Sequence, residues 1–187
     1  WRSWARRGRP VVKEYQEEYF SRIALVFDTF LPRRPRRIER RGFEAGVSLV
    51  ASIADHFSRR EEIVDLFAAG PDIYQLSAGR SLAYLSNVLD VLACLEPCHE
   101  PPFDEVGPHL HENLAQLTTV VAVVLDWDEQ REAFLLRLRE LGVAVRTFIV
   151  HPGPTGRRWD RVAPELGEIT LVTPDEVERR LVVGEQV

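Results

Sequence analysis

The stretch Arg22–Arg37, "RIALVFDTFLPRRPRR", carries the strongest structural signal in this sequence of 187 residues. Five consecutive apolar residues lead into Asp28 and Thr29, and a basic segment with two prolines follows. A continuous apolar run of this length is typical of a strand buried on both faces of a parallel sheet. We therefore expect residues 22–28 to form a central strand and residues 31–41 to form the loop after it.

Apolar periodicity in the rest of the chain predicts strands that alternate with helices. Further strands are expected over 11–16, 62–70, 72–79, 118–127, 143–150 and 168–173, with a hairpin at Gly70-Pro71. Helices are expected over 43–57, 81–96, 103–117, 128–142 and 174–182, with Gly142 and Pro174 marking a helix end and a helix start. In the helix over 81–96, we expect the stripe Leu82, Leu85, Leu89 and Leu92 to face the core.

This alternation predicts an α/β fold with a doubly wound, mostly parallel sheet and helices on both faces, a Rossmann-like arrangement. We place its centre at the strands 22–28, 118–126 and 143–150, which are the most continuously apolar. The first 20 residues are expected to be an N-terminal extension with an edge strand, and residues 21–187 to be one domain.

Composition is that of a globular protein, with 45% hydrophobic and 28% charged residues and a formal net charge of −5. No apolar run is long enough for a membrane span, and no signal peptide is visible. Residues 1–41 carry 12 basic and 5 acidic groups, whereas the remainder carries 12 and 24. Because the chain lacks methionine and opens at Trp1, we expect it to be a piece of a longer protein.

Acidic residues follow two of the expected central strands. Asp28 ends the first, and Asp126 ends a later one with Asp128 close behind. Ligands of doubly wound sheets bind at the carboxyl ends of the strands, and hard cations prefer oxygen ligands. These acids therefore allow a metal site, although Asp28 could equally accept backbone N–H bonds from its own loop.

With an aspartate at the first strand end, the expected sheet resembles von Willebrand factor A-type domains. In their adhesion site, an Asp-x-Ser-x-Ser loop joins a distant Thr and Asp to hold Mg²⁺. Here the loop reads Asp28-Thr29-Phe30-Leu31-Pro32, so neither serine position offers a side-chain oxygen. We expect a degenerate site at Asp28, Thr29, Asp126 and Asp128 that binds no metal and no cofactor.

In that degenerate site, an arginine should replace the lost cation. We expect Asp28 to accept backbone N–H bonds or to pair with an arginine, such as Arg33 or Arg80, and Asp126 to share this partner. Phe30 is expected to turn its ring toward the helix over 43–57.

A more specific resemblance covers most of the chain. It rests on "WRSWARRGRPVVKEYQEEYFSRIALVFDTF" (1–30), "FEAGVSLVASIADHFSRR" (43–60), "AGRSLAYLSNVLDVLACLEP" (78–97) and "LRELGVAVRTFIVHP" (138–152). These stretches resemble the bacterial family called domain of unknown function 58. The resemblance implies an A-type domain carried behind two N-terminal membrane helices on the cytoplasmic face, with a MoxR-type AAA ATPase as partner.

The basic segment after the first strand has several interpretations. Its six arginines are Arg33, Arg34, Arg36, Arg37, Arg40 and Arg41. They could form a solvated loop or, in a membrane-anchored parent, contact anionic head groups. Nucleic-acid binding is disfavoured because interleaved aromatic residues are missing and the whole chain is acidic.

The leading functional hypothesis is a non-enzymatic protein-interaction or scaffold domain. Phosphate-binding and serine-hydrolase motifs are absent from the sequence, and its five histidines are scattered. The alternative hypothesis is a metal-dependent hydrolase that uses Asp28, Asp126 and Asp128. The acids for that reaction are present, but no base or nucleophile stands out beside them.

Overall fold

The computed structural model describes residues 22–60, 62–69, 73–76, 82–103, 106–108 and 117–184. The expected extension over 1–20, its strand at 11–16, Arg80 and most of the expected helix over 103–117 lie outside these ranges.

The described residues form a six-stranded sheet in the order β3-β2-β1-β4-β5-β6. The strands are β1 (Arg22–Phe27), β2 (Ile63–Ala69), β3 (Ile73–Leu76), β4 (Thr119–Val124), β5 (Ala144–Val150) and β6 (Glu168–Val172). Five run parallel, and β3 pairs antiparallel with β2 across the predicted hairpin. The mostly parallel sheet is therefore confirmed, and the three strands predicted at its centre are all internal.

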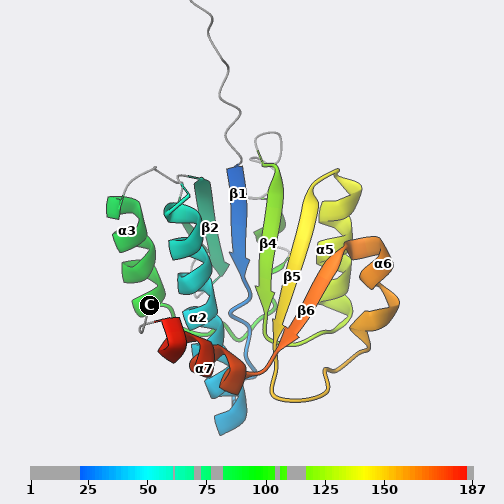
Figure 1. The fold of residues 1–187 in the computed structure, drawn as a ribbon. Helices are drawn as coiled ribbons and strands as arrows, with labels where there is room; N and C mark the ends of the chain where they lie inside the picture. The colour runs from blue at the N-terminus through cyan, green and yellow to red at the C-terminus, as the bar shows by residue number, and fades with distance from the viewer. Residues whose placement is uncertain are drawn as a thin grey trace, which may run out of the picture.

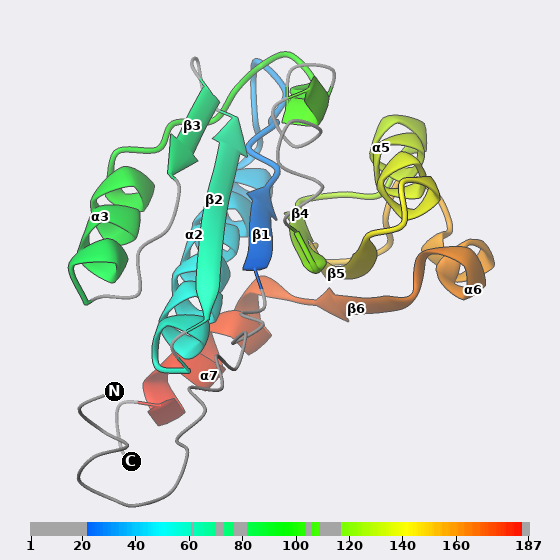
Figure 2. The ribbon, with the colours of Figure 1, turned by 90° about the horizontal axis from the view of Figure 1, so that it is seen from above.

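Helices cover both faces of this sheet, as predicted. They are α2 (Arg37–Ser58), α3 (Leu82–Ala93), α5 (Glu129–Glu140), α6 (Ala163–Leu166) and α7 (Pro174–Gly184), with a short 3₁₀ turn at Trp159–Arg161. Figures 1 and 2 show α2, α3 and α7 on one face and α5 and α6 on the other. Gly142, with φ +88°, follows the end of α5, and Pro174 opens α7 as expected.

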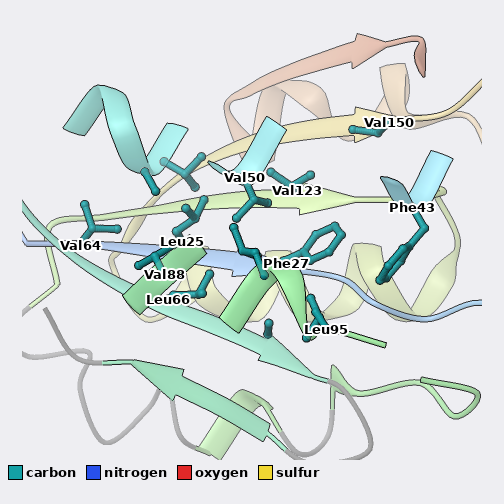
Figure 3. Close-up of a cluster of buried hydrophobic side chains, with 14 of the residues drawn as sticks. Leu25, Phe27, Phe43, Val50, Val64, Leu66, Val88, Leu95, Val123 and Val150 are labelled. Atoms are coloured by element: carbon teal, nitrogen blue, oxygen red, sulfur yellow. The ribbon is translucent and has the colours of Figure 1, made fainter. Parts of the chain in front are cut away.

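Side chains of β1 point alternately into two cores, which explains its continuous apolar run. Leu25 and Phe27 pack toward α2 and α3 in the cluster drawn in Figure 3. Ala24 and Val26 belong to the second cluster, beneath α5. Gly46 lets α2 approach β1 closely, because a Cβ there would lie 2.7 Å from the ring of Phe27.

The predicted loop over 31–41 is wrong in its second half, since α2 begins at Arg37. Glu39 stabilises this start because its carboxylate accepts the backbone N–H of Arg36 at 2.6 Å. Arg41, one turn further on, forms ion pairs with Asp175 and Glu178 of α7. The high charge density of residues 31–41 predicted a loop. The hydrogen bond to Glu39 at the helix start and the ion pairs of Arg41 instead stabilise a helix from Arg37 onward.

The predicted core stripe of α3 is wrong at Leu89, whose side chain is 44% exposed. Leu92 is buried as predicted, but Tyr84 and Val88 are buried with it in place of Leu89. The hydroxyl of Tyr84 also donates a hydrogen bond to the carbonyl of Val64 in β2, and this bond fixes the rotation of the helix.

Candidate functional site

The predicted acids meet at the carboxyl ends of β1 and β4, at the lower edge of the sheet in Figure 1. The two strands are in register from Ile23 opposite Thr119 to Phe27 opposite Val123. The backbone N–H of Asp28 extends this pairing by donating to the carbonyl of Val123 at 2.9 Å. Asp28 therefore starts the loop after β1 beside the loop that carries Asp126 and Asp128.

Asp28 is buried, and N–H groups surround its carboxylate. Oδ1 accepts the backbone N–H of Phe30 at 2.9 Å, and Oδ2 accepts that of Leu125 at 3.2 Å. Oδ2 also lies 2.7 Å from both Nε and a terminal nitrogen of Arg131, which is in the first turn of α5. Asp28 thus accepts backbone N–H bonds and pairs with an arginine, as the sequence predicted.

The identity of that arginine was not predicted. Of the two arginines suggested from the sequence, only Arg33 lies within the described ranges. Its side chain is highly exposed, and its guanidinium lies 3.5 Å from the carboxylate of Glu100. Arg131 is 103 residues away from Asp28 in the chain, yet its side chain is only 3% exposed. One feature of the sequence could have indicated Arg131. It lies three residues after Asp128, in the first turn of a helix that begins near a strand end.

Arg131 is held on several sides at once. Asp128 caps α5 by accepting the backbone N–H of Arg131 at 2.9 Å, and its other oxygen pairs with the guanidinium. The rings of Phe30 and Phe103 each lie 5.6 Å from the guanidinium carbon, within the range of cation–π attraction. Burial by itself lowers the pKa of Arg131, but the charges of Asp28 and Asp128 outweigh it and raise that pKa. The guanidinium is therefore a permanent cation.

Asp126 has a different environment from the one predicted. Its Oδ1 accepts backbone N–H bonds from Trp127 at 2.7 Å and from Gly156 at 2.9 Å. Asp126 does not share the arginine through a hydrogen bond, because Asp128 takes that position. The expectation that Asp126 shares the partner of Asp28 is thus corrected.

The residues at this edge do not fit a magnesium ion. Oxygen ligands would have to converge on one point, but the guanidinium of Arg131 already contacts Asp28 and Asp128. Thr29 is buried and donates its hydroxyl to Cys98 Sγ at 3.3 Å rather than toward the acids. Among the described residues, no group of three or more His, Cys, Asp or Glu side chains could hold a metal.

A groove of about 390 Å³ opens above these residues, and we call it the strand-end groove. Its walls come from the loop after β1, the first turns of α2 and the loops after β4 and β5. The residues that line it include Phe30, Pro32, Arg36, Ile38, Glu39, Asp126, Asp128, Arg131, His151 and Pro152. Phe30 lines this groove beside Arg131, and its ring contacts the guanidinium of Arg131. The ring that packs on Phe43 of α2 is that of Phe27, so the prediction that Phe30 turns toward this helix is corrected.

The arginines of the basic segment fall into two groups. Arg33 pairs with Glu100 at 3.5 Å, Arg36 pairs with Glu39 at 2.8 Å, and Arg41 pairs with acids of α7. Arg34, Arg37 and Arg40 are exposed and form no ion pair with any residue that the structure describes. The second group therefore leaves positive charge on the surface at the start of α2.

Comparison with known proteins gives the fold a name. The vWF domain of the type V pili tip protein Mfa5 from Porphyromonas gingivalis aligns with a TM-score of 0.58 and 8% identity. That alignment covers 88% of this chain and 96% of the Mfa5 domain. The fold is von Willebrand factor A-like.

Two structures of proximal thread matrix protein 1 from the mussel byssus also match this fold. They align with TM-scores of 0.57 and 0.56 at 11% identity, over 88% of the domain. The domain spans 44% of the length of the mussel protein. No protein-family model and no curated protein matches the sequence.

Within the described ranges, no helix combines the length and the apolar character needed to cross a bilayer.

Proposed function

We propose that this A-type domain is a non-enzymatic protein-interaction domain that binds its partner without a divalent cation. The observation that carries the proposal is the buried contact between Arg131 and Asp28. A guanidinium supplies positive charge and N–H donors to Asp28 and Asp128 without requiring octahedral oxygen ligands. It thereby takes the position of the cation beside Asp28 and Asp128.

The alternative, a metal-dependent hydrolase, would need Asp28, Asp126 and Asp128 to face one cation. Two of these carboxylates face Arg131, and the third accepts the N–H of Gly156. This arrangement favours interaction over hydrolysis.

For the biological setting, we propose a bacterial protein of the domain of unknown function 58 family, anchored in the membrane. The domain would lie on the cytoplasmic face and act as a scaffold for a MoxR-type AAA ATPase. Support comes from the sequence resemblance, whose most specific part is residues 1–30. The unpaired Arg34, Arg37 and Arg40 would contact anionic head groups of that membrane rather than nucleic acid.

The test is calorimetry of the unaltered chain with MgCl₂ and MnCl₂, together with thermal unfolding in either salt and in EDTA. We expect no saturable heat and no change in Tm, because a ligand that binds only the folded state would raise Tm. The proposed ATPase should also be retained on the immobilised domain equally in EDTA and in Mg²⁺. Saturable Mg²⁺ binding that disappears in Asp28→Ala would overturn the proposal.

A further inference from the structure

The strand-end groove has an uneven balance of charge. Arg36 and Glu39 pair with each other at its rim, so their charges cancel. Asp126, Asp128 and Arg131 also line it, and Asp28, which is buried outside the lining, pairs with the same guanidinium as Asp128. Among these described groups, three carboxylates stand against one guanidinium, and His151 is the one other lining side chain, apart from the paired Arg36, that can carry a positive charge.

The excess of negative charge is greatest at Asp126. Only its Oδ1 accepts hydrogen bonds, from Trp127 and Gly156. Its Oδ2 has no donor among the residues that the structure describes, and the side chain is half-buried on the groove wall. A carboxylate oxygen in this position gains from a charged donor, because charge-assisted hydrogen bonds are roughly twice as strong as neutral ones.

Apolar side chains form the rim above Asp126. Ile38, in the first turn of α2, lines the groove and is 44% exposed. Phe30, Pro32 and Pro152 continue the apolar surface. An occupant that fits both parts must combine an apolar stem with a cationic head.

We propose that the strand-end groove binds a lysine or arginine side chain of the protein partner. The aliphatic stem would pack against Ile38 and Pro32, and the cationic head would donate to Oδ2 of Asp126. Lysine and arginine have this division, since their stems cover apolar surface while the charged head reaches polar groups. The inference rests on the proposed function, because it names the chemistry of the partner at that same site.

A partner carboxylate fits the groove poorly, in contrast to a site built on a metal ion. Arg131 is the cation at the floor, but it is 3% exposed and already contacts two carboxylates. An incoming acid would meet Asp126 and Asp128 without a free cation to bind. A buried arginine at the position a metal ion would take therefore makes this edge prefer a cationic group to an anionic one.

The experiment is a titration of the ¹⁵N-labelled 187-residue chain with three blocked tripeptides, followed by NMR in EDTA. The probes are acetyl-Leu-Lys-Leu-amide, its norleucine analogue, which keeps the stem without the ammonium, and its glutamate analogue. We expect the lysine peptide to shift the amide signals of Trp127 and Gly156 and to bind about tenfold more tightly than the norleucine peptide. The glutamate peptide should bind most weakly.

Asp126→Asn is the matched variant, because asparagine keeps an oxygen for the Trp127 and Gly156 amides and removes the charge. It should abolish the preference for lysine over norleucine. Glu168→Gln, which changes an exposed acid on β6 away from the groove, should retain it. The peptide series on the unaltered chain keeps the proposal testable if Asp126→Asn fails to fold.

Equal binding of the lysine and norleucine peptides, preference for glutamate, or no shift at millimolar peptide would overturn this inference. Each of those results leaves the proposed ion-independent interaction standing, since that fails only if Mg²⁺ binds saturably. The two proposals can therefore fail separately.

Discussion

The carboxylate of Asp28 lies 2.7 Å from two nitrogens of Arg131, although 103 residues separate them in the chain. Both side chains are almost fully buried, so each ion depends on the other for its solvation. Removing one partner from such a pair leaves a charge in a poorly solvated site, which is more costly than the pair itself is favourable. The pair therefore joins β1 to α5 at the strand ends.

Replacing Arg131 with alanine should destabilise the domain by about 3–5 kcal/mol, because the charge of Asp28 would stay buried without a partner. Urea unfolding followed by circular dichroism measures this loss. Arg137→Ala, on the same helix but exposed, is the control and should change stability by less than about 0.5 kcal/mol. If both variants were equally stable, the pair would have no structural role.

Acidification should weaken the start of α2. Hydrogen bonds from the side chain and backbone of Arg36 lower the pKa of Glu39 below its ordinary value of 4.5. A lowered folded-state pKa stabilises the fold above pH 4.5, and this contribution is lost as the pH falls through the folded-state pKa.

Unfolding experiments between about pH 3 and pH 7 should therefore show a stability difference between the unaltered chain and Glu39→Gln that shrinks below pH 4.5. Glu140→Gln, at the end of α5, serves as the control. A difference that is constant over the whole range would show that the charge of Glu39 does not support the helix start.

Gly46→Ala should destabilise the domain by about 1–3 kcal/mol, even though alanine favours helices. The new Cβ would lie 2.7 Å from the ring of Phe27 and 3.1 Å from a methyl group of Leu125. Phe27 cannot easily move, because it is buried against Phe43. Gly107→Ala is the matched control, since a Cβ there would meet no atom of a described residue within 4 Å. Chemical denaturation compares the two, and equal stability would contradict the close approach of α2 to β1.

Binding of the domain to vesicles should depend on the unpaired arginines of α2 and the loop before it. Replacing Arg34, Arg37 and Arg40 with serine should weaken co-sedimentation with anionic vesicles by about 1 kcal/mol per arginine, or about fivefold each. Vesicles of neutral lipid should bind neither form. Arg137→Ser tests whether the loss of any exposed arginine weakens vesicle binding to the same extent. An equal loss of binding in that variant would show that the basic segment has no specific role.

Local sequence patterns determined the strands, the helix order and the place of the acids. The apolar run of β1 predicted burial on both faces because neighbouring side chains of a strand point to opposite sides. Phe30 and Pro32 led us to predict a degenerate metal site because neither has a side-chain oxygen. These inferences use only neighbouring residues, and periodicity and side-chain chemistry are local properties.

Tertiary structure alone decided which arginine reaches Asp28 and which face of α3 is buried. Arg33 is far closer to Asp28 in the chain, but the register of β1 with β4 brings the first turn of α5 to Asp28 instead. Likewise, Leu89 and Val88 are both apolar on the same helix, and only the packing of α3 beside α2 and the core selects Val88. Contacts across the sheet depend on strand register and helix rotation, which result from the packing of the whole domain and have no local signature in the sequence.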